Sequence, residues 1–226
     1  EYIERYKVFN EAIAEKYPEI IIVSGSGPFP DGDYFEYGMK ELKKIGAEII
    51  DEHYYRSPEW FRENATRYDS YDRNGPKIFA GEYAAQTVAI ASPDNKNSWD
   101  AALSEAAFMT GLERNAEVVQ LTSYAPLMAH ADGWQWTPDM IWFNNLESYG
   151  TPNYYVQKLY AQFSIQKTII YYKSAILKSK LPKDFFIKNR GVGNVPFHKE
   201  KYIVVMHHPE TTKFTETYSQ IRQTID

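Results

Sequence analysis

The sequence predicts an α/β protein built around a parallel β-sheet. Over the first 125 residues, four short apolar runs alternate with segments of helical periodicity. Each run contains adjacent apolar residues, which is typical of strands buried on both faces. The helices between the runs are long enough for parallel crossover connections. Four such units make half of an eight-stranded barrel or most of an open, doubly wound sheet.

The chain opens with a predicted helix and strand. Apolar residues of the helix recur at helical spacing, at Tyr2, Tyr6, Phe9 and Ile13. Pro18 ends the helix, and residues 20–23, IIIV, form the first predicted strand. Residues 24–27, SGSG, then form a glycine-containing turn. The turn lacks the GxGxxG spacing, so we do not expect a phosphate-binding loop there.

The second unit has clear boundaries. Asp33 can cap its helix, and Gly46 can end it. Residues 48–55 follow as the second predicted strand. Ser57-Pro58 then starts the next helix, because proline is favoured at the first helical position.

The same rhythm gives two further strands. Residues 76–82 form the third, and residues 117–122 form the fourth. Ser98 caps the long helix between them.

Composition excludes several classes of protein. The 226 residues carry a net charge of −5, which argues against a nucleic-acid-binding face. We find no apolar run long enough to cross a membrane, and residues 1–5, EYIER, do not resemble a signal peptide. Cysteine is absent, so disulfides and thiolate sites are excluded, while the compartment stays undetermined. The aromatic content of 16% suits sugar binding and core packing equally.

Charge divides the chain near residue 165. Residues 166–226 hold eleven Lys and Arg against five Asp and Glu, a net of +6, which leaves −11 for the residues before them. The βα rhythm also stops there. We therefore expect one domain over residues 1–165 and an irregular, divergent tail over residues 166–226.

Polar residues at the predicted strand ends are the candidates for chemistry, because the active site of a parallel barrel lies at that edge. Glu82 directly follows a buried strand, where a carboxylate needs partners or a catalytic function. Catalysis and a structural role are equally supported at this point. Gly81 before it leaves room for a ligand or a backbone to approach closely.

A second polar cluster, His53, Tyr54 and Tyr55, ends the second strand. Alternation should turn Asp51 and His53 to the same side. A hydrogen-bonded core histidine is the alternative to a site residue. We expect no metal, because ligands at short spacing are missing and His207-His208 lies in the tail.

The segment 130–139, HADGWQWTPD, combines indole rings with hydrogen-bonding side chains in an irregular stretch. Binding surfaces often occur in such segments, although buried tryptophans could also pin a loop.

Together these segments resemble the α-L-arabinofuranosidases of glycoside hydrolase family 51. The resemblance runs from residue 1 to about residue 162. It rests on several ordered motifs: residues 51–61 (DEHYYRSPEWF), 77–84 (KIFAGEYA), 123–127 (SYAPL), 132–143 (DGWQWTPDMIWF) and 149–156 (YGTPNYYV).

The resemblance implies strands five to eight of a (β/α)8 barrel, and hydrolysis of terminal arabinofuranosyl units with retention and without a cofactor. Glu82 would be the nucleophile. His53 and Tyr55 would line the sugar subsite, with Tyr54 close by. Trp136 and Asp139 would come from the last loop, although other members have an amide at the position of Asp139.

One catalytic group of the family has no match. Its acid/base glutamate lies in a Gly-Asn-Glu turn, and no such triplet precedes Glu82. Glu52 and Glu147 are the nearest substitutes, but neither is in the matching place. The chain also starts without methionine, directly in a helical pattern, so we expect a fragment whose acid/base lies upstream.

Three hypotheses follow. The chain is the second half of an arabinofuranosidase that acts on arabinose-containing plant polysaccharides or oligosaccharides. Alternatively, it belongs to a related retaining xylosidase or endoglucanase. A third alternative is a non-catalytic fragment that binds sugar or does not fold stably alone. Homo-oligomerisation of the full-length parent is left open.

Overall fold

The computed structural model describes residues 1–163, and the predicted tail over residues 166–226 lies outside them. Four strands form one parallel sheet in chain order: β1 (Val23–Gly25), β2 (Ile49–Arg56), β3 (Lys77–Ala85) and β4 (Val119–Tyr124). The predicted α/β class with a parallel sheet is confirmed. Strand β1 begins at Val23, where the predicted run ends.

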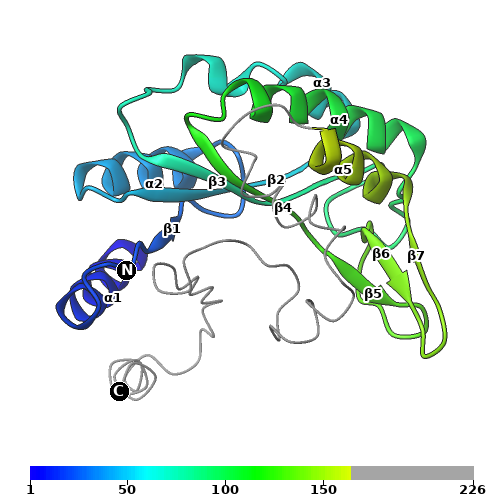
Figure 1. The fold of residues 1–226 in the computed structure, drawn as a ribbon, viewed down its shortest axis with the longest axis horizontal. Helices are drawn as coiled ribbons and strands as arrows, with labels where there is room; N and C mark the ends of the chain where they lie inside the picture. Colours follow the sequence, from blue (N-terminus) through cyan, green and yellow to red (C-terminus); the bar gives the residue numbers. More distant parts are fainter. Residues whose placement is uncertain (164–226) are drawn as a thin grey trace.

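The described helices are α1 (Tyr2–Lys16), α2 (Asp33–Lys44), α3 (Pro58–Glu63), α4 (Trp99–Arg114) and α5 (Pro152–Phe163), with a 3-10 helix, η1 (Arg67–Ser70). Helices α3, α4 and α5 lie together on one side of the sheet (Figure 1). No helix in this part of the chain is long and apolar enough to span a membrane.

Two of the three predicted helix caps are confirmed. The Ser57 hydroxyl accepts a hydrogen bond from Trp60 N–H (3.4 Å), and the Ser98 hydroxyl accepts one from Ala101 N–H (3.1 Å). The prediction for Asp33 was wrong, because Gly32 takes the cap position. Asp33 is instead the first helical residue, where a carboxylate suits the helix dipole.

Aromatic rings fill the core between the sheet and these helices. Phe108 of α4 packs against Tyr54 of β2 (5.2 Å between ring centroids) and Phe61 of α3 (5.3 Å). Tyr83 of β3 joins the same group, and Trp60 stacks on Tyr54 at 5.7 Å. Strand β2 is therefore fixed from its helix-covered face by large, well-packed side chains.

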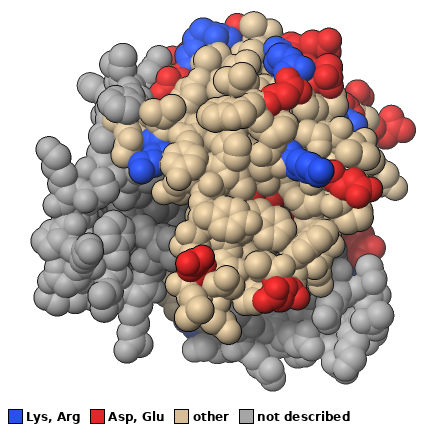
Figure 2. Space-filling model, turned by 90° about the vertical axis from the view of Figure 1, so that its right-hand side faces the viewer, with Lys and Arg blue, Asp and Glu red and all other residues tan. Residues whose placement is uncertain are grey.

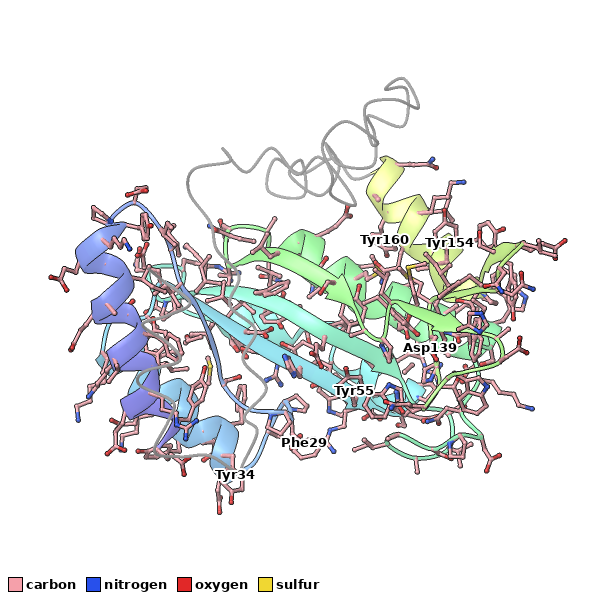
Figure 3. All side chains as sticks on the ribbon, turned by 90° about the horizontal axis from the view of Figure 1, so that it is seen from below. Phe29, Tyr34, Tyr55, Asp139, Tyr154 and Tyr160 are labelled. Atoms are coloured by element: carbon pink, nitrogen blue, oxygen red, sulfur yellow. The ribbon has the colours of Figure 1, made fainter. Side chains whose placement is uncertain are left out.

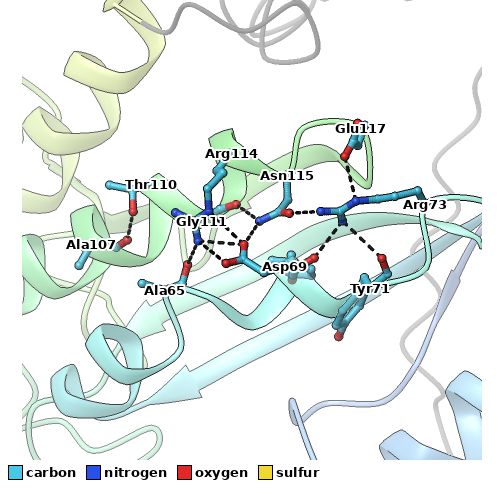
Figure 4. A network of polar contacts seen from close by, with 11 residues as sticks. Ala65, Asp69, Tyr71, Arg73, Ala107, Thr110, Gly111, Arg114, Asn115 and Glu117 are labelled. Carbon is cyan, nitrogen blue, oxygen red and sulfur yellow. Dashed lines mark hydrogen bonds and ion pairs between the residues drawn. The ribbon is translucent and has the colours of Figure 1, made fainter.

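A polar network ties η1 to the start of β4 (Figure 4). Arg114 contacts the Asp69 carboxylate at 2.9 Å, and Asn115 Nδ2 donates to the same carboxylate at 2.7 Å. Arg73 links Asn115 to Glu117 through its guanidinium. These contacts lie at the amino end of β4, opposite to the strand ends where the candidate site was predicted.

A second, small sheet was not predicted. It comprises β5 (Met128–His130), β6 (Ile141–Phe143) and β7 (Ser148–Gly150), with β5 parallel and β7 antiparallel to the central β6. Three residues are too few to show an alternating pattern in a sequence. The tryptophan-rich segment lies between β5 and β6.

Candidate active site

Strand β2 presents different side chains to the two faces of the sheet. Asp51, His53 and Tyr55 share the face away from α3 and α4, while Glu52 and Tyr54 face those helices. His53 Nε2 lies 2.8 Å from Asp51 Oδ2, so the predicted common orientation of these two residues is confirmed.

A bulge in β3 brings Glu82 to this same face. In the pairing of β2 with β3, Glu52 lies opposite Ala80, but the next residue, His53, lies opposite Glu82. Gly81 is the extra residue. Strict alternation along β3 would turn Glu82 with Ala80 towards the helices, whereas the bulge places it beside His53.

Side chains of both neighbouring strands satisfy the peptide groups of Gly81. Its N–H donates to Asp51 Oδ1 (3.0 Å), and its carbonyl accepts a hydrogen bond from the Ser123 hydroxyl. A Cβ at this position would lie 2.1 Å from Asp51 Oδ1. The space predicted at Gly81 is therefore occupied by a carboxylate, and glycine is required for that contact.

One oxygen of the Glu82 carboxylate is held and the other is open. Tyr55 donates a hydrogen bond to Oε2 (2.7 Å), and His53 Nδ1 lies 3.4 Å from the same atom. Within residues 1–163, no hydrogen bond reaches Oε1. The side chain is 19% exposed, so this carboxylate can be approached.

The two neighbouring carboxylates favour the protonated form of His53. Burial opposes protonation of His53, but its hydrogen bond to Asp51 and the charges of Asp51 and Glu82 outweigh burial and raise its pKa. Burial and the hydrogen bond to Glu82 raise the pKa of Tyr55, which stays a neutral donor. Within residues 1–163, the Glu82 carboxylate is therefore contacted by the His53 imidazole and by one hydroxyl donor.

Tyr54 was predicted to lie close to the sugar subsite, but it lies on the opposite face of the sheet from His53 and Tyr55. Its side chain is fully buried on the helix-covered face, where the hydroxyl contacts Glu52 and Tyr68. Glu52 is also fully buried there and pairs with Arg67 at 3.3 Å. Period-two alternation from Asp51 and His53 would have separated both residues from the site.

Trp136 and Asp139 lie in the segment between β5 and β6. Trp136 is 48% exposed, whereas Asp139 is 3% exposed and its Oδ2 has no hydrogen-bond partner. Burial raises the pKa of Asp139 to about 6. In the described chain, no hydrogen bond or ion pair joins either residue to Glu82. Figure 3 shows Tyr55 and Asp139 towards the same end of the strands, so they share an edge without direct contact.

The small sheet exposes large apolar side chains. Figure 2 shows that this end of the molecule is mostly uncharged. Its exposed residues include Leu127, Met128, Trp134, Trp136, Leu146 and Tyr149. Glu147, one of the two substitutes considered for the acid/base, lies in the turn between β6 and β7 and is exposed. Within the described residues, no cluster of three potential ligands could hold a metal ion.

The roles of Asp51 and Ser123 were missed from the sequence. Both are polar residues near strand ends, and a glycine inside the strand between them was the available signal of a bulge. A pairing register was needed to show that all three residues meet.

Comparison with known proteins identifies the family that the chain resembles. Residues 1–73 match the family model of the alpha-L-arabinofuranosidase 1 domain, and residues 81–176 match that of the alpha-L-arabinofuranosidase C-terminal domain. An extracellular exo-alpha-L-arabinofuranosidase of Streptomyces chartreusis is 53% identical over 71% of this chain and 18% of its own length. Alpha-L-arabinofuranosidase 1 of Arabidopsis thaliana is 36% identical over 72% of this chain and 22% of its own length.

A solved structure is similar as well. An arabinose-bound family 51 α-L-arabinofuranosidase superimposes with a TM-score of 0.59 and 32% identity, over 74% of this chain and 26% of that one.

The matches define the class first: the proteins that the chain resembles are glycoside hydrolases. Within that class, the chain belongs to the α-L-arabinofuranosidases of family 51. The chain spans about a fifth of the length of the curated relatives it matches.

Proposed function

We propose that the protein containing this chain is a retaining α-L-arabinofuranosidase and that Glu82 is its nucleophile. The observation that carries the proposal is the half-satisfied Glu82 carboxylate, with Oε2 held by Tyr55 and Oε1 open. A nucleophile needs a fixed orientation and a free lone pair, and Glu82 has both. The arabinose bound in the similar solved structure supports the sugar.

The four-stranded sheet supports a placement within a barrel. We infer that β1 to β4 are strands five to eight of a (β/α)8 barrel, because they are parallel, adjacent in chain order and separated by helices. Glu82 then ends strand seven, and its face of the sheet is the barrel interior. His53 and Tyr55 would line the subsite for the furanose ring, with Trp136 and Asp139 supplied by the loop after strand eight.

Retention requires a second carboxyl group about 5–5.5 Å from the nucleophile. Asp51 lies on the correct face, but its oxygens are engaged by His53 and the Gly81 N–H. Glu52 faces the helices. We therefore propose that the acid/base glutamate comes from a part of the parent enzyme that this sequence does not contain.

The proposed reaction has two steps, in which Glu82 and the acid/base glutamate take part. Glu82 forms a bond to the anomeric carbon as the glycosidic C–O bond breaks, and the acid/base gives its proton to the departing oxygen. Water then attacks the anomeric carbon, the acid/base takes a proton from it, and Glu82 is released. His53 and Tyr55 orient the carboxylate throughout, because both contact its Oε2.

The test is Glu82→Ala in the full-length enzyme that contains this chain. Turnover of p-nitrophenyl α-L-arabinofuranoside should be lost, and azide should restore part of it with inversion of configuration. The exposed Glu147→Ala is the matched control and should retain wild-type turnover. A Glu82→Ala variant that keeps more than about a tenth of wild-type turnover would exclude Glu82 as the nucleophile.

A second test uses the 226-residue chain itself. Because the acid/base is proposed to lie elsewhere in the parent, the purified chain should show no measurable hydrolysis. Clear activity that disappears in the Glu82→Ala chain would show that the second carboxyl is within it.

A further inference from the structure

A second glutamate, Glu105 of α4, is fully buried and has no part in the proposed chemistry. Its Oε1 accepts a hydrogen bond from the backbone N–H of Ala85 (2.8 Å), and its Oε2 accepts one from Asn153 Nδ2 (2.7 Å). Ala85 ends β3, three residues after Glu82. Burial raises the pKa of Glu105, and the two hydrogen bonds oppose this shift because they favour the charged form. A buried carboxylate is costly, so its position calls for an explanation.

The hydrogen bonds continue from Glu105 to the loop that contains Asp139. Asn153, at the start of α5, accepts a hydrogen bond through Oδ1 from Asn97 Nδ2 (2.9 Å). Asn97 in turn accepts one through Oδ1 from the backbone N–H of Asp139 (3.1 Å). Three side chains from different segments therefore connect the end of β3 to Asp139 without a break.

The direction of these hydrogen bonds is fixed by the groups at the two ends of the hydrogen-bonded series. Both ends are backbone N–H groups, of Ala85 and Asp139, and such groups can only donate. Asn97 and Asn153 each accept a hydrogen bond through the side-chain oxygen and donate one through the side-chain nitrogen. The backbone N–H of Asp139 therefore determines which atom of each amide faces the next residue. Two donors therefore converge on residue 105, and only a group that accepts at both ends satisfies them. A glutamine there would place its own N–H₂ against a donor.

Neighbouring contacts hold the same loop. Asn97 Nδ2 also donates to the Tyr124 hydroxyl (3.0 Å), which belongs to β4. Asn95 Nδ2 donates to the carbonyl of Thr137 (3.1 Å), two residues before Asp139. The loop is thus fixed at two backbone positions, and the Asp139 carboxyl, with its unpartnered Oδ2, has one defined location.

We propose that Glu105, Asn153 and Asn97 form a positioning chain that fixes Asp139 relative to the strand of Glu82, and that the chain works only if one carboxylate accepts the two converging donors. The proposal rests on the proposed substrate contact of Asp139. Glu105 itself is a positioning residue, because it touches no substrate.

The test exchanges the carboxylate and the amide in the full-length enzyme. Glu105→Gln leaves two donors facing each other, and Asn153→Asp places two carboxylates in contact. Each should lower kcat/KM for p-nitrophenyl α-L-arabinofuranoside about tenfold or more, because a small misplacement in a site is costly. The double variant E105Q/N153D moves the carboxylate from residue 105 to residue 153. Every hydrogen bond in the series then joins one donor to one acceptor again. It should recover to within about threefold of wild type.

The double variant is also the control for single variants that fold poorly. Of the three variants, it alone should recover the wild-type melting temperature. A double variant no better than the worse single variant would overturn the proposal, and so would an unchanged kcat/KM in Glu105→Gln. Added to Asp139→Ala, Glu105→Gln should cause no further loss in kcat/KM. A full additional loss would show that Glu105 does not act through Asp139. Failure of the function proposed for Glu82 would appear separately, as activity retained by Glu82→Ala.

Discussion

Glu52 and Glu82 lie on neighbouring strands and on opposite faces of the same sheet, in very different surroundings. Glu52 is fully buried and is contacted by Arg67 and by the hydroxyls of Tyr54, Tyr68 and Tyr71. Glu82 is 19% exposed, and its contacts are limited to one oxygen. A carboxylate can accept about four hydrogen bonds, so Glu52 has little capacity left whereas Glu82 retains most of its own.

The difference separates a structural carboxylate from a reactive one. Donors that surround Glu52 compensate its burial and leave nothing for a ligand. The donors at Glu82 fix its direction and leave one oxygen free. Burial and the number of donors therefore distinguish two glutamates that both lie in predicted strands.

The largest expected effect is on turnover. Glu82→Gln should lower kcat on the order of 10⁴-fold or more, because the amide is a poor nucleophile. Its thermal stability should stay close to that of the wild type, since Tyr55 can still donate to the amide oxygen. Steady-state kinetics and a melting curve on the same full-length enzyme check both points. A large loss of stability would place Glu82 with the structural carboxylates.

Glu52→Gln should show the opposite pattern. It leaves the guanidinium of Arg67, whose side chain is 13% exposed, without its counter-charge, and breaking a buried pair costs up to about 3–5 kcal/mol. Denaturant unfolding of the full-length enzyme measures this loss, with exposed Glu147→Gln as the control. The turnover of each folded Glu52→Gln molecule should be nearly that of the wild type. A loss of activity without a loss of stability would contradict the structural role.

Gly81→Ala should have an intermediate effect on both properties. The new Cβ would lie 2.1 Å from Asp51 Oδ1, so the bulge must shift, at about 1–3 kcal/mol. Because Glu82 follows directly, kcat should also fall, on the order of 100-fold. Gly133→Ala is the matched control, since nothing lies within 4 Å of its Cβ position. Equal effects of the two substitutions would argue against the close contact.

The smallest effect concerns the charge of His53. Because the folded protein raises the pKa of His53, its charge stabilises the fold fully below the ordinary value of about 6.5. This contribution is lost as the pH rises through the raised pKa. Asp51→Asn removes the hydrogen bond and the nearest negative charge, so the pH at which His53 loses its proton should move down.

NMR titration of isotope-labelled histidine in the full-length enzyme would follow this shift. Ser123→Ala is the control, because it removes the other contact to Gly81 without changing a charge. An Asp51→Asn variant with an unchanged His53 titration would show that Asp51 does not hold the charge of this imidazole.

Much of the fold could be predicted from the sequence. Strands β2 and β3 each contain adjacent apolar residues near their starts, and serine before a helix marked the starts of α3 and α4. The short strands β5 to β7 could not be predicted, because three residues carry no period. Glu82 and His53 were identified as strand-end residues, but their contact depends on the bulge, which is a property of the pairing between strands.

The orientation of Tyr54 is a different case, because the sequence contained the necessary information. Alternation along β2 separates it from His53 and Tyr55, whereas proximity in the motif suggested a shared role. The partners of Glu105 could not be foreseen at all. Asn97 and Asn153 lie 56 residues apart, and no local pattern connects them.

The bulge at Gly81 also has a consequence for how sequences of this family diverge. Asp51 and Ser123 replace strand neighbours as partners of the Gly81 peptide, so this peptide is satisfied only while both side chains are present. A lineage that lost one would leave a buried peptide group unsatisfied and would gain little from retaining the rest. We therefore expect these positions to covary among relatives, with all three changing together where the nucleophile strand pairs without a bulge.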